Sequence, residues 1–66
     1  MAPRWVYAAG NSWVPFNDAA NYKIEEIFRS GGEGNVNVPG LSAYISTVRL
    51  YMWQPGLQRK ICRTGC

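Results

Sequence analysis

The chain has 66 residues, of which 47% are apolar and 14% aromatic, and its net charge is +3. This composition excludes a disordered segment and predicts one small ordered domain over residues 1–66, with room for a single core. No run of about 18 apolar residues could cross a bilayer, and the first residues lack the apolar stretch of a secretion signal. We therefore expect a soluble, intracellular protein of the nucleus or cytoplasm.

The cysteine content limits covalent and metal chemistry. Cys62 and Cys66 are the only cysteines, and the chain has no histidine. A disulfide across so short a loop would stabilise the fold little, and a structural zinc ion usually takes four ligands. We expect free thiols and no metal, with a disulfide or a disulfide-linked dimer as the alternative.

The positive charge is concentrated in the second half of the chain. Residues 1–33 hold three basic and four acidic side chains, whereas residues 34–66 hold four basic side chains and no acidic one. These four are Arg49, Arg59, Lys60 and Arg63. The pattern indicates a surface that attracts an anion, although a solvated basic face without a binding role explains it equally.

The N-terminal residues predict a β-hairpin. Residues 4–8 alternate between two faces, with Trp5 and Tyr7 on the same one, and a Gly-Asn turn then leads into a returning strand at residues 13–16. Pro15 cannot donate a hydrogen bond to a neighbouring strand. The second strand should therefore lie at a sheet edge or end at this proline.

Residues 18–29 predict an amphipathic helix. Asn17 is a suitable N-cap, and Ser30 is followed by two glycines that can end the helix. Apolar side chains recur at helical spacing along one face. They are Ala20, Ile24, Ile27 and Phe28.

The remainder of the chain predicts β-strands. Residues 35–38 alternate, residues 43–54 are rich in β-branched and aromatic side chains, and residues 57–63 form a final basic strand. Pro-Gly pairs provide the turns between them. The element order is β-β-α-β-β-β in an α+β fold, with the long 43–54 stretch either bent or split in two.

The inventory of side chains predicts a binding protein and not an enzyme. Histidine is absent, as are a paired nucleophile and base and a phosphate-binding glycine loop. Tyr7, Tyr44, Gln54 and Arg59 together suit an adenine nucleotide. Tyrosines stack and donate hydrogen bonds, a carboxamide pairs with the adenine edge, and a guanidinium matches phosphate oxygens. Each tyrosine is equally compatible with an ordinary core position.

The order and spacing of several residues is similar to that of the WWE domain, a family named for two tryptophans and a glutamate. The matching residues are Trp5-x-Tyr7, Trp13-x-Pro15-Phe16, Asn21-x-x-Ile24-Glu25, Tyr44, Met52-x-Gln54 and Gly56-x-x-Arg59-x-Ile61-x-Arg63. The likeness covers residues 4–63, the expected core of the domain. It implies a strongly curved antiparallel half-barrel sheet of about five or six strands packed on one helix. Family members occur beside ubiquitin-ligase and ADP-ribosyltransferase domains.

The resemblance implies a non-catalytic module that binds ADP-ribose units. These are the iso-ADP-ribose of poly(ADP-ribose) or a terminal ADP-ribose, on polymer chains or on ADP-ribosylated proteins. Gln54 would contact the adenine edge, Tyr7 and Tyr44 would line the pocket, and Arg59 would bind phosphate. We expect a monomer without a cofactor, a metal or a membrane partner.

Other residues join the candidate site with different support. Lys60 and Arg63 are added on charge alone. Trp5 is included as a ligand contact, although a structural role is favoured for it and for Trp13. Glu25 is expected to anchor the helix to the sheet or to cap a backbone group.

Two departures from the family spacing leave alternatives open. Between Tyr44 and Gln54 the chain has one residue more, so either a β-bulge absorbs it or Gln54 is out of register with the adenine. The loop from Gln54 to Arg59 is short. A protein-protein adaptor of the same fold is therefore the second interpretation, and a single-stranded nucleic-acid binder is the least favoured.

Overall fold

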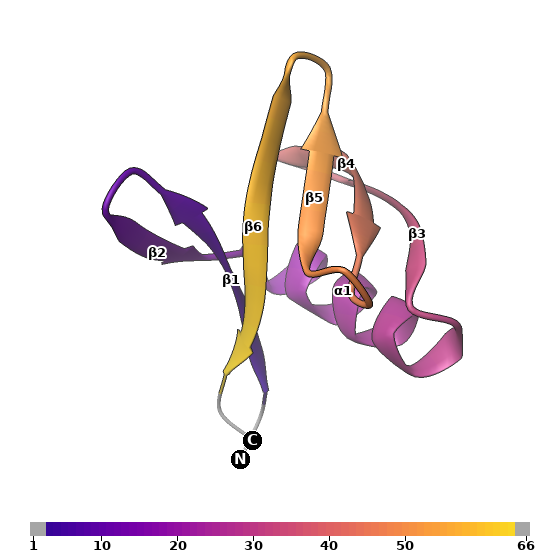
Figure 1. Cartoon of the computed structure of the whole chain (residues 1–66). Coiled ribbons are helices and arrows are strands. Elements are labelled where there is room, and N and C mark those ends of the chain that lie inside the picture. Colours follow the sequence, from indigo (N-terminus) through magenta and orange to yellow (C-terminus); the bar gives the residue numbers. More distant parts are fainter. Residues whose placement is uncertain (1–2, 65–66) are drawn as a thin grey trace.

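Six antiparallel strands and one helix form the described part of the chain, residues 3–64, in this computed structural model (Figure 1). The elements are β1 (Arg4–Ala9), β2 (Ser12–Pro15), α1 (Asp18–Ser30), β3 (Glu33–Val38), β4 (Leu41–Ser46), β5 (Tyr51–Gln54) and β6 (Leu57–Thr64). The predicted 43–54 stretch is split in two by a turn at residues 47–50. The observed order is therefore β-β-α-β-β-β-β, in an α+β fold.

The last strand joins two parts of the sheet, whose order is β2-β1-β6-β5-β4-β3. The first half of β6 pairs with β5, from Gln54↔Leu57 to Tyr51↔Lys60. Its second half pairs with β1, up to Arg4↔Thr64. The β1–β2 hairpin and the β3–β5 meander are thus held together in one sheet through β6.

The sheet is not strongly curled, which corrects the expected strongly curved half-barrel. Strong curvature is normally produced by β-bulges or glycine kinks. The pairings of β6 with its two neighbours and of β4 with β3 and β5 advance one residue at a time, without a bulge. The edge strands β2 and β3 consequently remain at opposite ends of an open sheet.

The predicted local signals at the helix ends are confirmed. The Asn17 side chain accepts a hydrogen bond of 2.8 Å from the Ala20 amide, as an N-cap does. At the other end, the Gly32 amide donates to the Ile27 carbonyl. Gly32 has a φ of +91°, and a Cβ there would lie 2.6 Å from the Val48 methyl, so glycine is required for both reasons.

The core lies between α1 and the sheet. Its buried members are Trp5, Phe16, Ala20, Ile24, Val36, Ala43, Ile45, Met52 and Ile61. The predicted apolar helix face is confirmed for Ala20 and Ile24, and Ile27 packs against this core. Phe28 is 44% exposed and meets Trp5 edge-on at 5.6 Å between ring centroids, so it covers the rim of the core.

The prediction that Trp13 has a structural role is wrong, because its side chain is 53% exposed. Trp13 lies on the edge strand β2 opposite Ala8. Pro15 ends the same strand, as predicted. An edge position leaves the indole without a packing neighbour on its outer side, which sequence alternation alone does not reveal.

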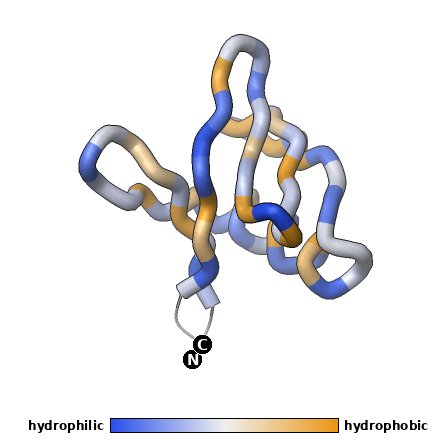
Figure 2. The backbone as a smooth tube through the Cα atoms, in the orientation of Figure 1, coloured by the Kyte–Doolittle hydropathy of each residue, from blue (hydrophilic) through white to orange (hydrophobic). Residues whose placement is uncertain are grey.

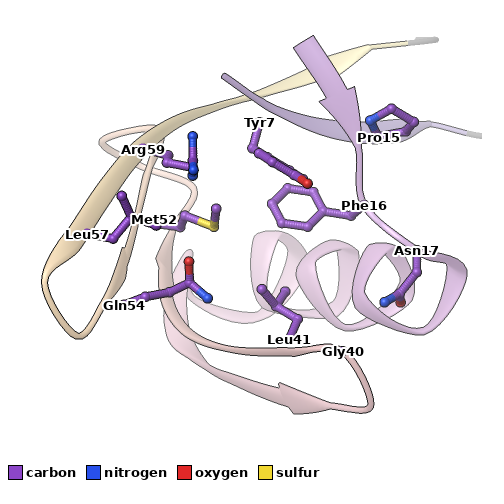
Figure 3. Close-up of a pocket in the computed structure, with 10 residues that line it drawn as sticks. All are labelled: Tyr7, Pro15, Phe16, Asn17, Gly40, Leu41, Met52, Gln54, Leu57 and Arg59. Atoms are coloured by element: carbon purple, nitrogen blue, oxygen red, sulfur yellow. The ribbon is translucent and has the colours of Figure 1, made fainter. Parts of the chain in front are cut away.

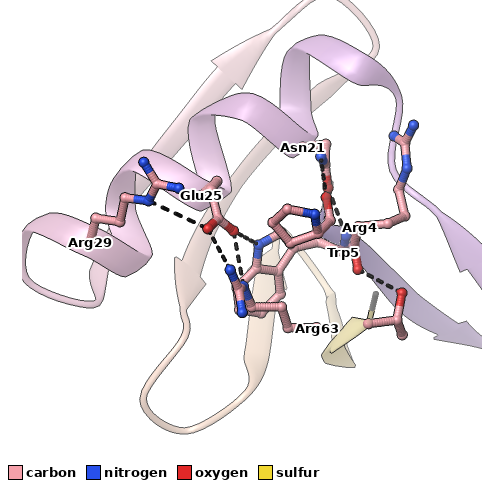
Figure 4. Close-up of polar contacts among 8 residues, drawn as sticks. Arg4, Trp5, Asn21, Glu25, Arg29 and Arg63 are labelled. Carbon is pink, nitrogen blue, oxygen red and sulfur yellow. Dashed lines mark hydrogen bonds and ion pairs between the residues drawn. The ribbon is translucent and has the colours of Figure 1, made fainter. Parts of the chain in front are cut away.

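A partly buried carboxylate fastens α1 to the sheet, which confirms the anchoring role expected of Glu25 (Figure 4). The Trp5 indole donates to Glu25 Oε1 at 2.8 Å. Arg63 binds the same carboxylate through Nη2 at 2.7 Å and Nε at 3.1 Å. A further bond of 2.6 Å from the Trp5 amide to Asn21 Oδ1 ties β1 to the helix one turn earlier.

This network favours the ionised form of Glu25. Its hydrogen bonds with Arg63, assisted by those from Trp5 and by the charge of Arg29, outweigh the effect of burial and lower the pKa of Glu25 from 4.5 to about 2. Because the pKa is lowered on folding, the network stabilises the fold fully above about pH 4.5 and loses that contribution as the pH falls toward 2.

Shortening a core side chain should cost measurable stability. Ile45 is fully buried, so Ile45→Val is expected to lower the free energy of unfolding by about 0.5–1.5 kcal/mol in urea denaturation. Val48→Ala is the control: Val48 is 71% exposed, and its truncation should change stability by less than about 0.5 kcal/mol. Equal losses in the two variants would refute this placement of the core.

The pH dependence of stability should follow Glu25. The shift from 4.5 to about 2 corresponds to a contribution of the order of 3 kcal/mol at neutral pH. Glu25→Gln should therefore lower the melting temperature at neutral pH and flatten its decline from roughly pH 5 to pH 2. The neighbouring Glu26→Gln, whose carboxylate pairs with Lys23 at the surface, serves as control. Parallel pH profiles for wild type and Glu25→Gln would contradict the assignment.

Candidate functional site

A cavity of about 390 Å³ opens on the helix side of the sheet, beyond the N-terminal end of α1 (Figure 3). This volume lies within the range typical of small-molecule sites. We call it the Gln54 cavity. Its lining comes from the sheet and from two loops, namely Tyr7, Pro15, Phe16, Asn17, Gly40, Leu41, Met52, Gln54, Leu57 and Arg59.

Strand register explains why the polar members meet. Met52 is opposite Arg59 and Gln54 is opposite Leu57 in the β5–β6 hairpin, so these four side chains share one face. Tyr7 is opposite Ile61 on the adjacent strand β1 and faces the same way. The alternation of side chains along these strands thus places the predicted residues Tyr7, Gln54 and Arg59 on the same face of the sheet.

Arg59 is held in place without using all its donors. Its Nη1 donates to the Ala8 carbonyl at 3.0 Å, and its guanidinium carbon lies 5.8 Å from the centre of the Tyr7 ring. A guanidinium has five N–H donors, so donors remain for an anion in the cavity. The Tyr7 ring in turn lies 4.9 Å from that of Phe16, which fixes one aromatic wall.

Gln54 keeps the hydrogen-bonding groups of its side chain open to solvent and available to a ligand. Its half-buried carboxamide points into the cavity and makes no hydrogen bond with another side chain or backbone group of residues 3–64. A primary amide offers two donors and one acceptor oxygen. The cavity therefore combines a pairing edge, a cation and an aromatic wall, with Met52 and Leu57 as apolar surfaces.

Four other predicted site residues lie elsewhere. Tyr44 and Lys60 point to the opposite face of the sheet, where Tyr44 pairs with Trp53 and Lys60 with Tyr51. Arg63 faces the helix side but binds Glu25 and lies over Phe28, 4.7 Å from its ring. Trp5 is fully buried. None of the four lines the Gln54 cavity.

The segment from Tyr44 to Gln54 consists of the end of β4, a turn at residues 47–50 and β5. The β4–β5 ladder contains no bulge among its described pairs, and Leu50 in the turn adopts a φ of +64°. Gln54 consequently faces the cavity while Tyr44 faces away from it. Of the two alternatives, the β-bulge is therefore wrong for the described β4–β5 pairs, and Gln54 and Tyr44 do not share a face of the sheet.

Several lining residues were not predicted as functional. Phe16, Met52 and Leu57 belong to predicted strands, Asn17 is the expected N-cap, and Leu41 lies between the predicted elements. Met52 and Leu57 were within reach of sequence reasoning, because both share a face with Gln54 once the tight Pro55-Gly56 turn is accepted. Leu41 depends on how β4 lies across the sheet, which carries no local signal.

Further observations bear on the predicted absences. Residues 3–64 contain no group of three or more His, Cys, Asp or Glu side chains able to hold a metal ion. Within the same residues, α1 is neither long nor apolar enough to cross a membrane. Cys62 has a free thiol, while Cys66 lies outside the described residues.

Comparison with protein-family models, curated proteins and solved structures finds no match to this chain.

Proposed function

We propose that the chain is a non-catalytic module that binds an ADP-ribose unit in the Gln54 cavity. The unit is either iso-ADP-ribose within poly(ADP-ribose) or a terminal ADP-ribose on a modified protein. The proposal is supported by the spacing of the residues from Trp5 to Arg63 and by the meeting of Tyr7, Gln54 and Arg59 at one cavity. In this role the module would bring an attached ubiquitin-ligase or ADP-ribosyltransferase domain to ADP-ribosylated targets inside the cell.

Each part of the ligand has a matching group. The adenine ring would lie against the apolar Met52 and Leu57, with its edge paired to the Gln54 carboxamide. The Tyr7 hydroxyl would form a hydrogen bond with a ribose hydroxyl. The Arg59 guanidinium, which keeps free donors beside its bond to Ala8, would take a phosphate oxygen in a charge-assisted hydrogen bond.

The observation that carries the proposal is the orientation of Gln54. A half-buried carboxamide that faces a cavity without a partner among residues 3–64 can exchange its hydrogen bonds to water for bonds to a complementary ligand edge. Adenine offers such an edge, with a donor beside an acceptor. A cation on the opposing strand then selects adenine compounds that carry phosphate.

The geometry of the cavity also determines the affinity that we expect for the ADP-ribose ligand. Of the four basic residues in the second half of the chain, Arg59 alone lines the cavity. Lys60 faces the other side of the sheet and Arg63 is bound to Glu25. One phosphate contact instead of three predicts modest affinity, with the adenine pocket supplying much of the selectivity.

Calorimetric titration with iso-ADP-ribose, ADP-ribose and AMP tests this proposal. Saturable binding is expected for at least one ADP-ribose ligand. Gln54→Ala should weaken it about tenfold through lost neutral hydrogen bonds, and Arg59→Ala about 10- to 100-fold through a lost charge-assisted one. Melting curves of both variants establish that they remain folded, because Arg59 also bonds to Ala8.

A matched control lies in the same hairpin. Gln58 is an exposed glutamine on the other face of β6, opposite Trp53, so Gln58→Ala should bind as wild type does. Tyr44→Ala should likewise leave the affinity unchanged, since Tyr44 points away from the cavity. Absence of saturable binding to all three ligands would reject the proposal and leave a protein-protein adaptor as the interpretation of the fold.

A further inference from the structure

Four aromatic side chains lie on the face of the sheet opposite α1. Trp13 is 53% and Tyr44 38% exposed, while Tyr51 and Trp53 are half-buried. We call this set the aromatic face. It is separate from the core, whose buried residues lie between the sheet and α1, and the helix leaves this face uncovered (Figure 1).

Three of these rings form a continuous row across β4 and β5. Tyr44 and Trp53 are directly opposite each other, with ring centroids 5.9 Å apart. Tyr51 and Trp53 follow at 5.8 Å, and both pairs are tilted, by 50° and 41° respectively. Tilted pairs of this kind are a favoured arrangement of aromatic rings, and an aromatic ring is a group on which a nucleic-acid base can stack.

Two hollows extend the row at its ends. One, of about 400 Å³, is lined by Tyr51 and Trp13 together with Arg49 and Lys60. The other, of about 270 Å³, lies beside Tyr44 and Trp53. Trp13 thus continues the row on the far side of β6. We call the four rings and the two hollows the strip, which has room for several planar groups.

The charge along this strip is positive. Lys60 is directly opposite Tyr51, and Arg49 lies in the turn before it; neither forms an ion pair within residues 3–64. Figure 2 shows a hydrophilic stretch within the first half of β6. The acid at the strip's far end, Glu33, accepts hydrogen bonds from Tyr44 at 3.1 Å and Ser46 at 2.9 Å and so holds the Tyr44 ring in place.

This combination favours one class of ligand. A row of aromatic rings beside the cations Lys60 and Arg49 complements a chain of bases linked by phosphates, and stacking is tolerant of base identity. Tryptophan, tyrosine and arginine are also common at protein interfaces, but Lys60 is not a residue typical of them, and a row of rings flanked by cations on one face suits a polyanion with planar groups. Double-stranded nucleic acid hides the faces of its bases, so it could use the cations but not the rings.

We propose that the aromatic face is a second binding site, which takes single-stranded nucleic acid by stacking on Trp13, Tyr51, Trp53 and Tyr44 and by phosphate contacts to Lys60 and Arg49. The site is independent of the ADP-ribose proposal, since none of these side chains lines the Gln54 cavity. Its recognition is expected to depend little on sequence and strongly on salt.

Fluorescence anisotropy with labelled oligouridylate and oligothymidylate of about eight nucleotides tests this proposal. Trp53→Ala should raise Kd about tenfold or more, while Trp53→Phe, which keeps a stacking ring, should stay within about threefold. Two phosphate contacts predict a slope of log Kd against log salt of about 1.4, which Lys60→Gln should lower by about 0.7.

Matched controls come from the helix. Tyr22→Ala removes a 66% exposed aromatic ring and Lys23→Gln a surface cation, both from α1, and neither should change Kd. Circular dichroism checks the folding of each variant. If Trp53→Ala does not fold, Trp53→Phe and Lys60→Gln carry the test together with quenching of tryptophan fluorescence on binding.

Three results would overturn the proposal. They are absence of saturable binding to both oligonucleotides, equal affinity for a duplex of the same length, and loss of oligonucleotide binding in Gln54→Ala. The second would reduce the interaction to phosphate attraction. The third would place the nucleic acid in the Gln54 cavity instead. A failure of ADP-ribose binding, by contrast, leaves this proposal untouched.

Discussion

The fold depends on one carboxylate. Glu25 receives the Trp5 indole from β1 and the Arg63 guanidinium from β6, at the place where these two strands pair. The partial burial of this negative charge is offset by its hydrogen bonds and by the neighbouring cation. The helix is thereby fixed against one end of the sheet, and the remaining surface on that side stays open as the Gln54 cavity.

The alternation of β6 separates two kinds of chemistry. Arg59 and Arg63 face the helix side of the sheet. Arg59 lines the Gln54 cavity, and Arg63 binds the Glu25 carboxylate. Lys60, between them, faces the aromatic row. A basic run that looks uniform in sequence thus supplies a candidate ligand contact, a structural ion pair and a cation of the opposite face. Charge alone predicts attraction of an anion without saying on which side it would bind.

Local signals were sufficient for much of the fold. The first hairpin, the capped helix and the final hairpin follow from turn residues and from periodicity, which act over a few positions. The facing of Tyr44 could not be predicted, because it depends on how many residues the turn at 47–50 absorbs. The exposure of Trp13 depends on β2 being an edge strand beyond β1. Only Tyr7, Gln54 and Arg59 of the predicted site converge, since strand parity decides which side chains meet.

β6 pairs with β5 over its first half and with β1 over its second half, and this exchange of neighbours affects the order in which the sheet forms. Thr64 donates a hydrogen bond to Arg4 across 60 positions of sequence, and the pairing of β1 with β6 completes the sheet. Contacts of such large separation form slowly, because the entropy of closing the chain is lost before they stabilise anything. The β1–β2 hairpin and the β3–β5 meander are therefore segments that form early. We expect the pairing of β6 with β1 to join these two parts of the sheet in a late step of folding.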